Sequence, residues 1–194
     1  MILGLTGGIG CGKSTAARAF VAGGFRLVDA DALIRDQVLI APALVAAVAA
    51  RYGDGVLAPS GAINRAVLAK FVFADDAERW WLEARTHPAL FAIWRRMLAT
   101  APKARWVFEV PLLFEQALEN WFDFTVCVAC SPEQQLVRLE RRGLSRELAG
   151  QRISKQLPLA RKIELADLVL WNDGSAAFLQ AQVDTLVASL PGRR

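Results

Sequence analysis

Four glycines, a lysine and two hydroxyl-bearing residues stand together near the start of the chain. The stretch GGIGCGKST covers residues 7–15 and contains the complete pattern G-x4-G-K-[ST], from Gly7 to Ser14. Phosphate oxygens need many donors at close range, and glycines let backbone N–H groups converge without a Cβ in the way. The Lys13 ammonium adds charge beside the phosphates, and the Ser14 hydroxyl can coordinate Mg2+. The pattern predicts a nucleoside triphosphate site formed by Gly8, Ile9, Gly10, Cys11, Gly12, Lys13, Ser14 and Thr15.

The elements around this stretch are those that a phosphate-binding loop requires. Residues 1–6 are a short apolar run typical of a buried strand, and residues 13–22 are helix formers that end at Gly23-Gly24. The glycine-rich stretch therefore joins a strand to a helix whose N-terminal N–H groups and dipole favour an anion. This context disfavours a glycine turn without a ligand. The loop alone does not distinguish a kinase from a GTPase, a motor or a regulatory switch.

The rest of the chain alternates short apolar runs with helical patterns. Further strands are expected at residues 25–30, 104–110, 124–129 and 167–171. Helices are expected at residues 32–50, 65–73, 76–99, 132–142, 146–156 and 176–190, with breaks at Pro42 and at His87-Pro88. This alternation predicts an α/β fold with a five-stranded parallel sheet. The second and third strands lie about 70 residues apart, far beyond an ordinary crossover, so we expect a helical insertion between them.

Three acidic residues lie at or near the ends of predicted strands, where ligands of parallel sheets bind. Asp29 and Asp31 stand at the end of the second strand, and Glu109 lies in the third. A carboxylate there can accept a proton from an attacking hydroxyl or help to order Mg2+. We take Asp31 as the base, while the other aspartate caps the next helix or orders the metal. For Glu109, a metal site and an ion pair with an arginine or Lys13 are both open.

Five arginines surround Gly143 in a predicted helix–turn–helix, at positions 138, 141, 142, 146 and 152. A mobile arginine lid would shield a transferred phosphate from water and stabilise its charge. A solvated helical face is the common alternative for such a charge run. The nearby phosphate loop favours the lid.

Two features of the sequence bear on which nucleotide base is bound: a missing guanine-reading motif and a turn after the last predicted strand. The chain lacks the N-K-x-D run that GTPases use to read guanine. The turn at Asn172 follows the last predicted strand, where small kinases bind adenine. These features favour ATP.

Composition and charge narrow the class of protein. Of 194 residues, 54% are apolar and 22% charged, which indicates a globular chain. The net charge of +4 is dispersed, so nucleic-acid binding is not indicated. No apolar run is long enough to cross a bilayer, and the first residues do not resemble a signal peptide. With three cysteines, we expect a reducing compartment, and we place the protein in the cytoplasm as a monomer without a membrane partner.

The cysteines and the single histidine carry weaker signals. Cys127 and Cys130 have the spacing of half a zinc site without a second Cys/His pair, so we expect them to pack in the core. His87 on its own favours a structural role or a cap before Pro88. Cys11 lies within the phosphate loop, where the helix dipole and Lys13 would lower its pKa and make it oxidisable.

Together these segments resemble the bacterial dephospho-coenzyme A kinase family over nearly the whole chain. The phosphate-loop motif is common to many kinases, whereas VDAD, THP and PLLFE, in this order, are more specific. The matching segments are LTGGIGCGKST at 5–15, VDAD at 28–31, the pattern from Gly55 through Phe73, LEARTHP at 82–88, VPLLFE at 110–115, SPEQQLVRLERR at 131–142, QRI at 151–153 and ADLVLWNDG at 166–174. Glu109 departs from the family pattern, which has aspartate or an apolar residue there, and so does Leu170, where isoleucine is usual.

The resemblance implies transfer of the γ-phosphate of ATP to the ribose 3′-hydroxyl of dephospho-coenzyme A, with Mg2+ present. By motif match, Asp31 contacts or activates that hydroxyl, and Ser14 holds the metal. The implied catalytic residues are Asp31, Lys13, Arg138 and Arg142. The residues implied to bind or shape the acceptor, besides Asp31, are Arg65, His87, Pro111, Leu112 and Leu113.

The resemblance also implies a division into three parts. Residues 1–31, 104–137 and 164–194 would form the nucleotide-binding core, residues 32–103 a helical substrate domain, and residues 138–163 the lid. Two rival functions are another small-molecule kinase with the same loop, and a non-catalytic regulator that switches with ATP. The VDAD and PLLFE segments disfavour the first, and the acidic pair and the lid arginines disfavour the second.

Overall fold

The computed structural model describes residues 1–72 and 74–190. Their contacts divide the chain into two compact units. One contains Met1–Asp29 and Lys103–Arg194, and the other contains Ala30–Pro102. Phe73, the last residue of one predicted helix, lies outside the described residues.

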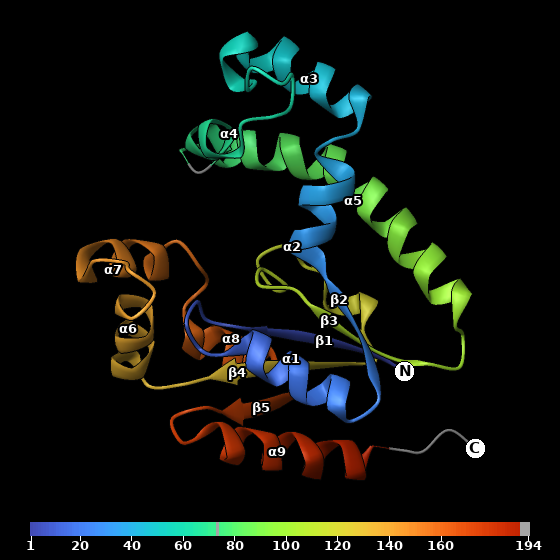
Figure 1. The fold of residues 1–194 in the computed structure, drawn as a ribbon, viewed down its shortest axis with the longest axis vertical. Helices are drawn as coiled ribbons and strands as arrows, with labels where there is room; N and C mark the ends of the chain where they lie inside the picture. The colour runs from blue at the N-terminus through green and yellow to red at the C-terminus, as the bar shows by residue number, and fades with distance from the viewer. Residues whose placement is uncertain (73, 191–194) are drawn as a thin grey trace. The chain divides into compact units, whose positions relative to one another are not determined.

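The first unit is built on a five-stranded sheet in which all strands are parallel, in the order β2-β3-β1-β4-β5 (Figure 1). The predicted α/β class and parallel sheet are confirmed, and each predicted strand is present within two residues of its expected bounds. The strands are β1 (Ile2–Gly7), β2 (Phe25–Asp29), β3 (Arg105–Glu109), β4 (Phe124–Ala129) and β5 (Leu168–Trp171).

The register brings several strand ends to one edge of the sheet. Gly7 at the end of β1 is paired with Val128 of β4. Asp29, the last residue of β2, is paired with Glu109, the last residue of β3. Because parallel strands end on the same side, the phosphate loop and these two carboxylates leave the sheet at the same edge.

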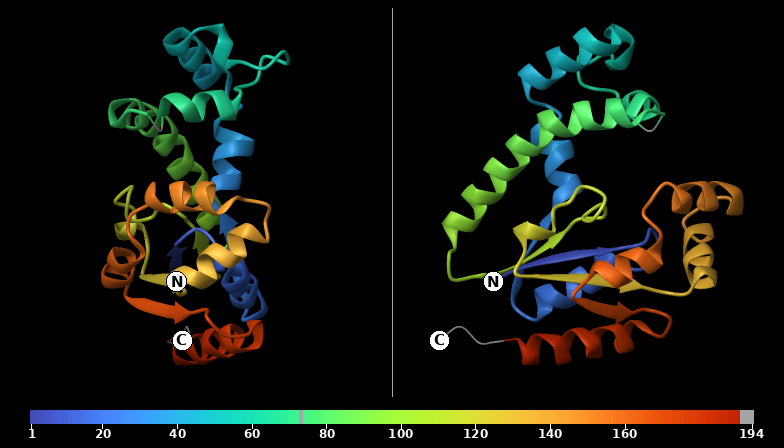
Figure 2. Two further views of the ribbon diagram at one scale, coloured as in Figure 1. Left: turned by 90° about the vertical axis from the view of Figure 1, so that its left-hand side faces the viewer. Right: turned by 180° about the vertical axis from the view of Figure 1, so that it is seen from behind.

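One face of this sheet is covered by α1 and α9, which pack on each other. Leu3 and Leu5 of β1, which point to the same face, are fully buried with Phe20 of α1 and Leu179 of α9. Figure 2 shows α9 alongside the sheet from two further directions. The helices of the unit are α1 (Lys13–Ala22), α6 (Pro132–Glu140), α7 (Arg146–Ser154), α8 (Leu159–Leu165) and α9 (Ala176–Ser189), with a short 3-10 turn at Glu119–Trp121.

The alternate positions of β1 point to the other face, where the segment after β3 and helix α8 lie. Gly4 lies against Leu113, and the Thr6 hydroxyl donates to the Pro111 carbonyl at 3.2 Å. Helix α8, which contacts β1 and β4, was not predicted. It buries Lys162 completely, and the Lys162 ammonium lies 2.8 Å from Glu115. This face therefore holds an ion pair between a buried lysine and a partly buried glutamate.

The second unit is entirely helical apart from one isolated bridge between Leu57 and Ile63 in its described residues. Its core consists of apolar side chains from all of its longer helices, among them Val48, Leu68 and Ile93. Asn64 begins α4 by accepting from the N–H of Val67. The helices are α2 (Ala30–Leu33), which runs into a π-helical turn at Ile34–Val38, then α3 (Pro42–Tyr52), α4 (Arg65–Val72) and α5 (Asp76–Thr100), with a 3-10 turn at Asp54–Val56.

The expected break at His87-Pro88 is wrong, because α5 continues through it as a single bent helix (Figure 1). An interior proline costs about 3 kcal/mol. Leu90 and Trp94, which follow Pro88, are almost fully buried, and burying such side chains contributes about 1.5–3 kcal/mol each. The packing of the second half therefore offsets the lost backbone hydrogen bond.

In the described residues, no single helix is both long and apolar enough to cross a bilayer. Ala30–Val38 and Pro42–Tyr52 reach that length and character only as a pair bent by 87°.

Candidate active site

The phosphate loop has the backbone that its glycines allow. Gly10 and Gly12 adopt φ angles of 81° and 99°, in the left-handed region that disfavours other residues. A Cβ at Gly12 would also collide with the side-chain amide of Asn172. Helix α1 begins at Lys13, directly after this turn, so the predicted strand–loop–helix is confirmed.

Lys13 is buried and lies under the loop. Its ammonium donates to the carbonyls of Gly7 and Gly8, both at 3.0 Å. The charge is thereby held at the carboxyl end of β1, which is where the motif requires it.

A cavity of about 270 Å³ opens over the loop. It brings together three cationic side chains, one carboxylate and the start of α1, which suits a multiply charged anion with a bound cation. Its lining consists of Ile9, Gly10, Gly12, Lys13, Ser14, Thr15, Arg18, Glu109 and Arg142.

Within this cavity the Ser14 hydroxyl donates to Glu109 at 3.0 Å. Among the described residues, no three His, Cys, Asp or Glu side chains converge in a way that could hold a metal ion. Mg2+ does not need such a cage, because it binds one or two protein oxygens and keeps waters and phosphate oxygens as its other ligands. The neighbouring oxygens of Ser14 and Glu109 fit that requirement.

Asn172 and Arg138 brace the loop from the side of β5. The Asn172 amide donates to the Cys11 carbonyl at 2.8 Å. The Arg138 guanidinium donates to the Asn172 carbonyl at 2.5 Å and reaches the Cys11 carbonyl at 3.5 Å. The polar groups of Asn172 thus hold protein atoms together. Its expected contact with adenine stays a prediction.

Two glutamines hold Ile9 of the loop through its backbone groups. Gln135 of α6 donates to the Ile9 carbonyl at 2.6 Å, and Gln156, just after α7, accepts from the Ile9 N–H at 2.9 Å. The segment expected to form the lid therefore touches a loop N–H group that phosphate binding would use.

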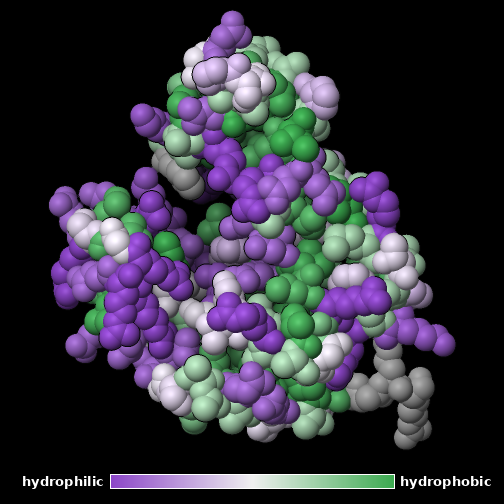
Figure 3. Space-filling model, viewed as in Figure 1, coloured by the Kyte–Doolittle hydropathy of each residue, from purple (hydrophilic) through white to green (hydrophobic). Residues whose placement is uncertain are grey.

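The arginine-rich segment is a helix–turn–helix formed by α6 and α7, as predicted. Gly143 turns the chain between the helices with a φ of 84°. The surface over α6 and α7 in Figure 3 is mostly hydrophilic. Arg142 of this segment lines the cavity, whereas Arg141, Arg146 and Arg152, which are exposed as Arg142 is, do not line it.

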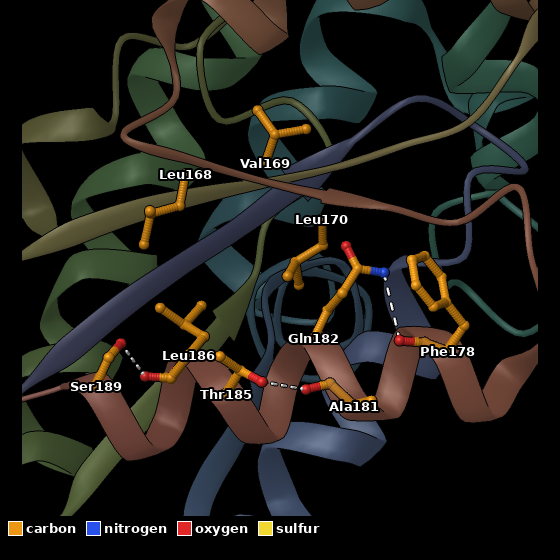
Figure 4. Close-up of a pocket in the computed structure, with 9 residues that line it drawn as sticks. All are labelled: Leu168, Val169, Leu170, Phe178, Ala181, Gln182, Thr185, Leu186 and Ser189. Carbon is orange, nitrogen blue, oxygen red and sulfur yellow. Dashed lines mark hydrogen bonds between the residues drawn. The ribbon is translucent and has the colours of Figure 1, made fainter.

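A larger hollow, of about 480 Å³, lies between β5 and α9 (Figure 4). Leucine side chains from both elements line it, and it contains no titratable side chain. The hydroxyls of Thr185 and Ser189 are occupied by carbonyls of their own helix. This hollow offers no group for chemistry, so the cavity over the phosphate loop is the candidate active site.

Known proteins are similar to this chain in sequence and in architecture. Residues 1–177 match the family described as dephospho-CoA kinase. A dephospho-CoA kinase of Thermosynechococcus vestitus is 46% identical over 98% of this chain and 95% of its own length.

The chain belongs to the dephospho-CoA kinase family.

Solved structures agree with that membership. A Thermus thermophilus protein superposes with a TM-score of 0.85 at 33% identity, covering 99% of this chain and 98% of its own. The dephospho-CoA kinase from Campylobacter jejuni gives a TM-score of 0.69 at 25% identity, covering 96% and 95%. A chain of the dephospho-CoA kinase family is an enzyme, a kinase that uses ATP.

Three residues matched to the acceptor side of the dephospho-CoA kinase family lie in the helical unit. Asp31 is the second residue of α2, Arg65 begins α4, and both are exposed. His87 is half-buried in α5, with its ring 5.5 Å from that of Phe91. Their roles toward an acceptor stay predictions.

The other three lie in the segment after β3. Pro111 offers its carbonyl to Thr6 and to Lys162, and Leu112 offers its carbonyl to the N–H of Gln116. Leu113 is fully buried, so its side chain can shape an acceptor site only by holding this segment in place.

Sequence reasoning missed several residues at the site. Arg18 lies one helical turn after Ser14 and lines the same cavity, so helical spacing could have found it. Gln135 and Gln156 carried no comparable signal, because glutamine is an ordinary helix residue and their partner Ile9 is distant in sequence.

Proposed function

We propose that the protein transfers the γ-phosphate of ATP to the ribose 3′-hydroxyl of dephospho-coenzyme A, giving ADP and coenzyme A. Membership of the dephospho-CoA kinase family supports the substrates. The observation that carries the chemistry is the cavity over the phosphate loop, which Lys13, Ser14, Glu109 and Arg142 line together.

The loop would bind the phosphates of ATP through its N–H groups and Lys13. The ammonium now donates to two loop carbonyls, and phosphate oxygens would compete for it. The Gln156 side chain would release the N–H of Ile9 to a phosphate oxygen. Arg142, which lines the cavity from the segment after α6, would stabilise the charge of the transferred group.

Mg2+ would be held by Ser14, with Glu109 accepting from that hydroxyl or from a water on the metal. Bound there, the ion would neutralise charge on the phosphate oxygens. Ser14 and Glu109 both offer oxygen atoms, which are the ligands that Mg2+ prefers.

Asp31 would accept the proton of the ribose 3′-hydroxyl. At the same time the hydroxyl oxygen would form a bond to the γ-phosphorus, and the bond from that phosphorus to the leaving ADP oxygen would break. The Asp31 carboxylate comes two residues after the end of β2, where Asp29 is paired with Glu109. The helical unit would hold the rest of the acceptor. A hollow of about 330 Å³ in that unit is lined by apolar side chains and Arg85, whose guanidinium would pair with a phosphate of the acceptor.

The proposal is tested by measuring ADP release from ATP and Mg2+ with a panel of acceptors. The panel contains dephospho-coenzyme A, adenosine, AMP, CMP, shikimate and gluconate, and the Lys13→Ala variant provides the loop-dependent control. Phosphorylation of dephospho-coenzyme A alone, at its 3′ position by phosphorus NMR and product mass, is the expected result. Turnover of a different acceptor would overturn the substrate, and ATP binding without any phosphorylated acceptor would overturn the kinase.

A further inference from the structure

Two buried thiols lie together beneath the phosphate loop. Cys11 is inside the loop and Cys130 follows β4, yet their Sγ atoms are only 3.5 Å apart. Their exposed fractions are 0% and 2%. The proposed phosphoryl transfer uses neither thiol, so the pair has no role in the function described above.

The surroundings make the two sulfurs unequal. The Cys130 thiol donates to the Cys11 sulfur and Lys13 adds positive charge nearby, so the pKa of Cys11 is lowered despite burial. Donation of that hydrogen bond and burial raise the pKa of Cys130. Cys127 lies in β4, three residues before Cys130, and burial raises its pKa to about 12. The surroundings therefore favour the thiolate form at Cys11 more than at Cys130, and the thiolate is the nucleophilic form.

We propose that Cys11 and Cys130 form a reversible disulfide on exposure to a small peroxide, and that this bond disables the phosphate loop. A disulfide requires about 2.05 Å between the sulfurs, so the pair must close by about 1.5 Å. The Cys11 carbonyl is fixed by Asn172 and Arg138, and the loop around it is crowded. Drawing Cys11 toward Cys130 therefore strains the loop that holds the phosphates.

The chemistry balances with the peroxide as the oxidant. The Cys11 thiolate attacks one peroxide oxygen, which forms an S–O bond, breaks the O–O bond and releases hydroxide. The Cys130 sulfur then attacks the Cys11 sulfur, forming the S–S bond as the S–O bond breaks. The proton of Cys130 and one from solvent leave with the two hydroxides. Two thiols are oxidised by two electrons, and one peroxide is reduced to two waters.

Because both sulfurs are buried, oxidation requires a local opening of the loop. A nucleotide that binds the closed loop opposes that opening, so it should slow the reaction. This second expectation rests on the proposed function, whereas formation of the disulfide does not.

The test uses the full chain with Cys127→Ala. Trypsin leaves Cys127 and Cys130 on one fragment, residues 106–138, and Cys11 on residues 1–13, so removing Cys127 makes the cross-link unambiguous. The protein is treated with hydrogen peroxide, with and without ATP, quenched with N-ethylmaleimide and digested without reductant. We expect the two fragments to appear joined, more slowly with ATP, and ATP binding to fall in proportion to the cross-linked fraction. Dithiothreitol should restore binding.

The matched control adds Cys130→Ala, or Cys130→Ser if alanine unfolds the chain. It should bind ATP like its parent and lack both the cross-link and the dithiothreitol-reversible loss. Oxidation of Cys11 without a bond to Cys130 overturns the site, and cross-linked chains that still bind ATP normally overturn its effect. ATP binding reports on the loop whatever the acceptor is, so failure of the proposed substrate leaves this test intact.

Discussion

Asp31 is the residue on which the proposed proton transfer depends. Asp31→Asn keeps the size of the side chain and removes its basicity, so ATP affinity should be unchanged. Turnover should fall by about two to four orders of magnitude, which is the usual contribution of a positioned base. Steady-state kinetics and ATP titration measure the two quantities separately. Asp29→Asn makes the same change at the end of β2, and we expect it to cost less turnover. Near-normal turnover in Asp31→Asn would remove it from this role.

Glu109 tests the metal assignment at the same scale. Its carboxylate accepts from Ser14 at 3.0 Å, and Glu109→Gln retains an acceptor oxygen but loses the charge. We expect the Mg2+ concentration for half-maximal activity to rise by about 10–100-fold, as for other residues that support a metal ligand. The measurement is a Mg2+ titration at saturating ATP, with Glu119→Gln, exposed in a 3-10 turn, as the control. An unchanged requirement would limit Glu109 to positioning Ser14.

At the scale of elements, the ion pair of Lys162 and Glu115 joins α8 to the segment after β3. Lys162 also donates to the Pro111 carbonyl at 2.7 Å, and Glu115 accepts from the N–H of Leu157 at 2.9 Å. Lys162→Met should lower the free energy of unfolding by about 3–5 kcal/mol, because it leaves a partly buried carboxylate without its cation. Urea denaturation measures the loss. Adding Glu115→Gln should recover part of it, and a fully additive second loss would contradict the coupling.

Helices α3 and α5 are joined by a surface cluster whose stability depends on pH. Glu78 accepts from Arg51 at 2.6 and 2.7 Å and from Tyr52 at 2.6 Å, and these hydrogen bonds lower the pKa of Glu78 to about 2. The unfolded chain has the ordinary value of 4.5, so the stabilisation is present above that pH and is lost as the pH falls toward 2.

Glu78→Gln should therefore be less stable than the parent at pH 7, and the difference should shrink between about pH 4.5 and pH 2. Urea midpoints across that range measure the effect. Asp76→Asn removes an exposed ion pair with Arg79 and should change the pH profile less. A difference between Glu78→Gln and the parent that stays constant with pH would contradict the assignment of the shift to this cluster.

Local patterns predicted the elements well where periodicity was undisturbed. Helix α1 and strand β4 begin and end at the expected residues, since one has clear caps and the other a continuous apolar run. Helix α8 was missed because it has only seven residues and buries Lys162 where an apolar residue is expected. The continuity of α5 could not be predicted, because it depends on burial of side chains after Pro88 by distant segments.

At the scale of the whole molecule, the fold and the phosphate loop could be predicted because both depend on local patterns. The fold follows from alternating strand and helix patterns, and the loop follows from one short motif. Glu109 was left between two roles, since its hydrogen bond to Ser14 joins residues 95 positions apart. The contacts of Gln156 and Asn172 with the loop are likewise products of topology, which brings the residues after α7 and after β5 to the phosphate loop. No spacing in one sequence encodes such contacts.

If one unit binds the nucleotide and the other binds the acceptor, the two ligands should produce separate patterns of hydrogen exchange. A non-hydrolysable ATP analogue should protect residues 7–15, whose N–H groups bind phosphate, and slow exchange in residues 138–163 if these close as a lid. Dephospho-coenzyme A should protect residues 32–103, where α3, α4 and α5 share one core. Exchange measured by mass spectrometry with each ligand alone resolves the two patterns. The control is coenzyme A lacking its nucleotide, pantetheine, which should protect fewer residues of the helical unit. Protection by dephospho-coenzyme A confined to the sheet unit would contradict the assignment of residues 32–103 as the substrate domain.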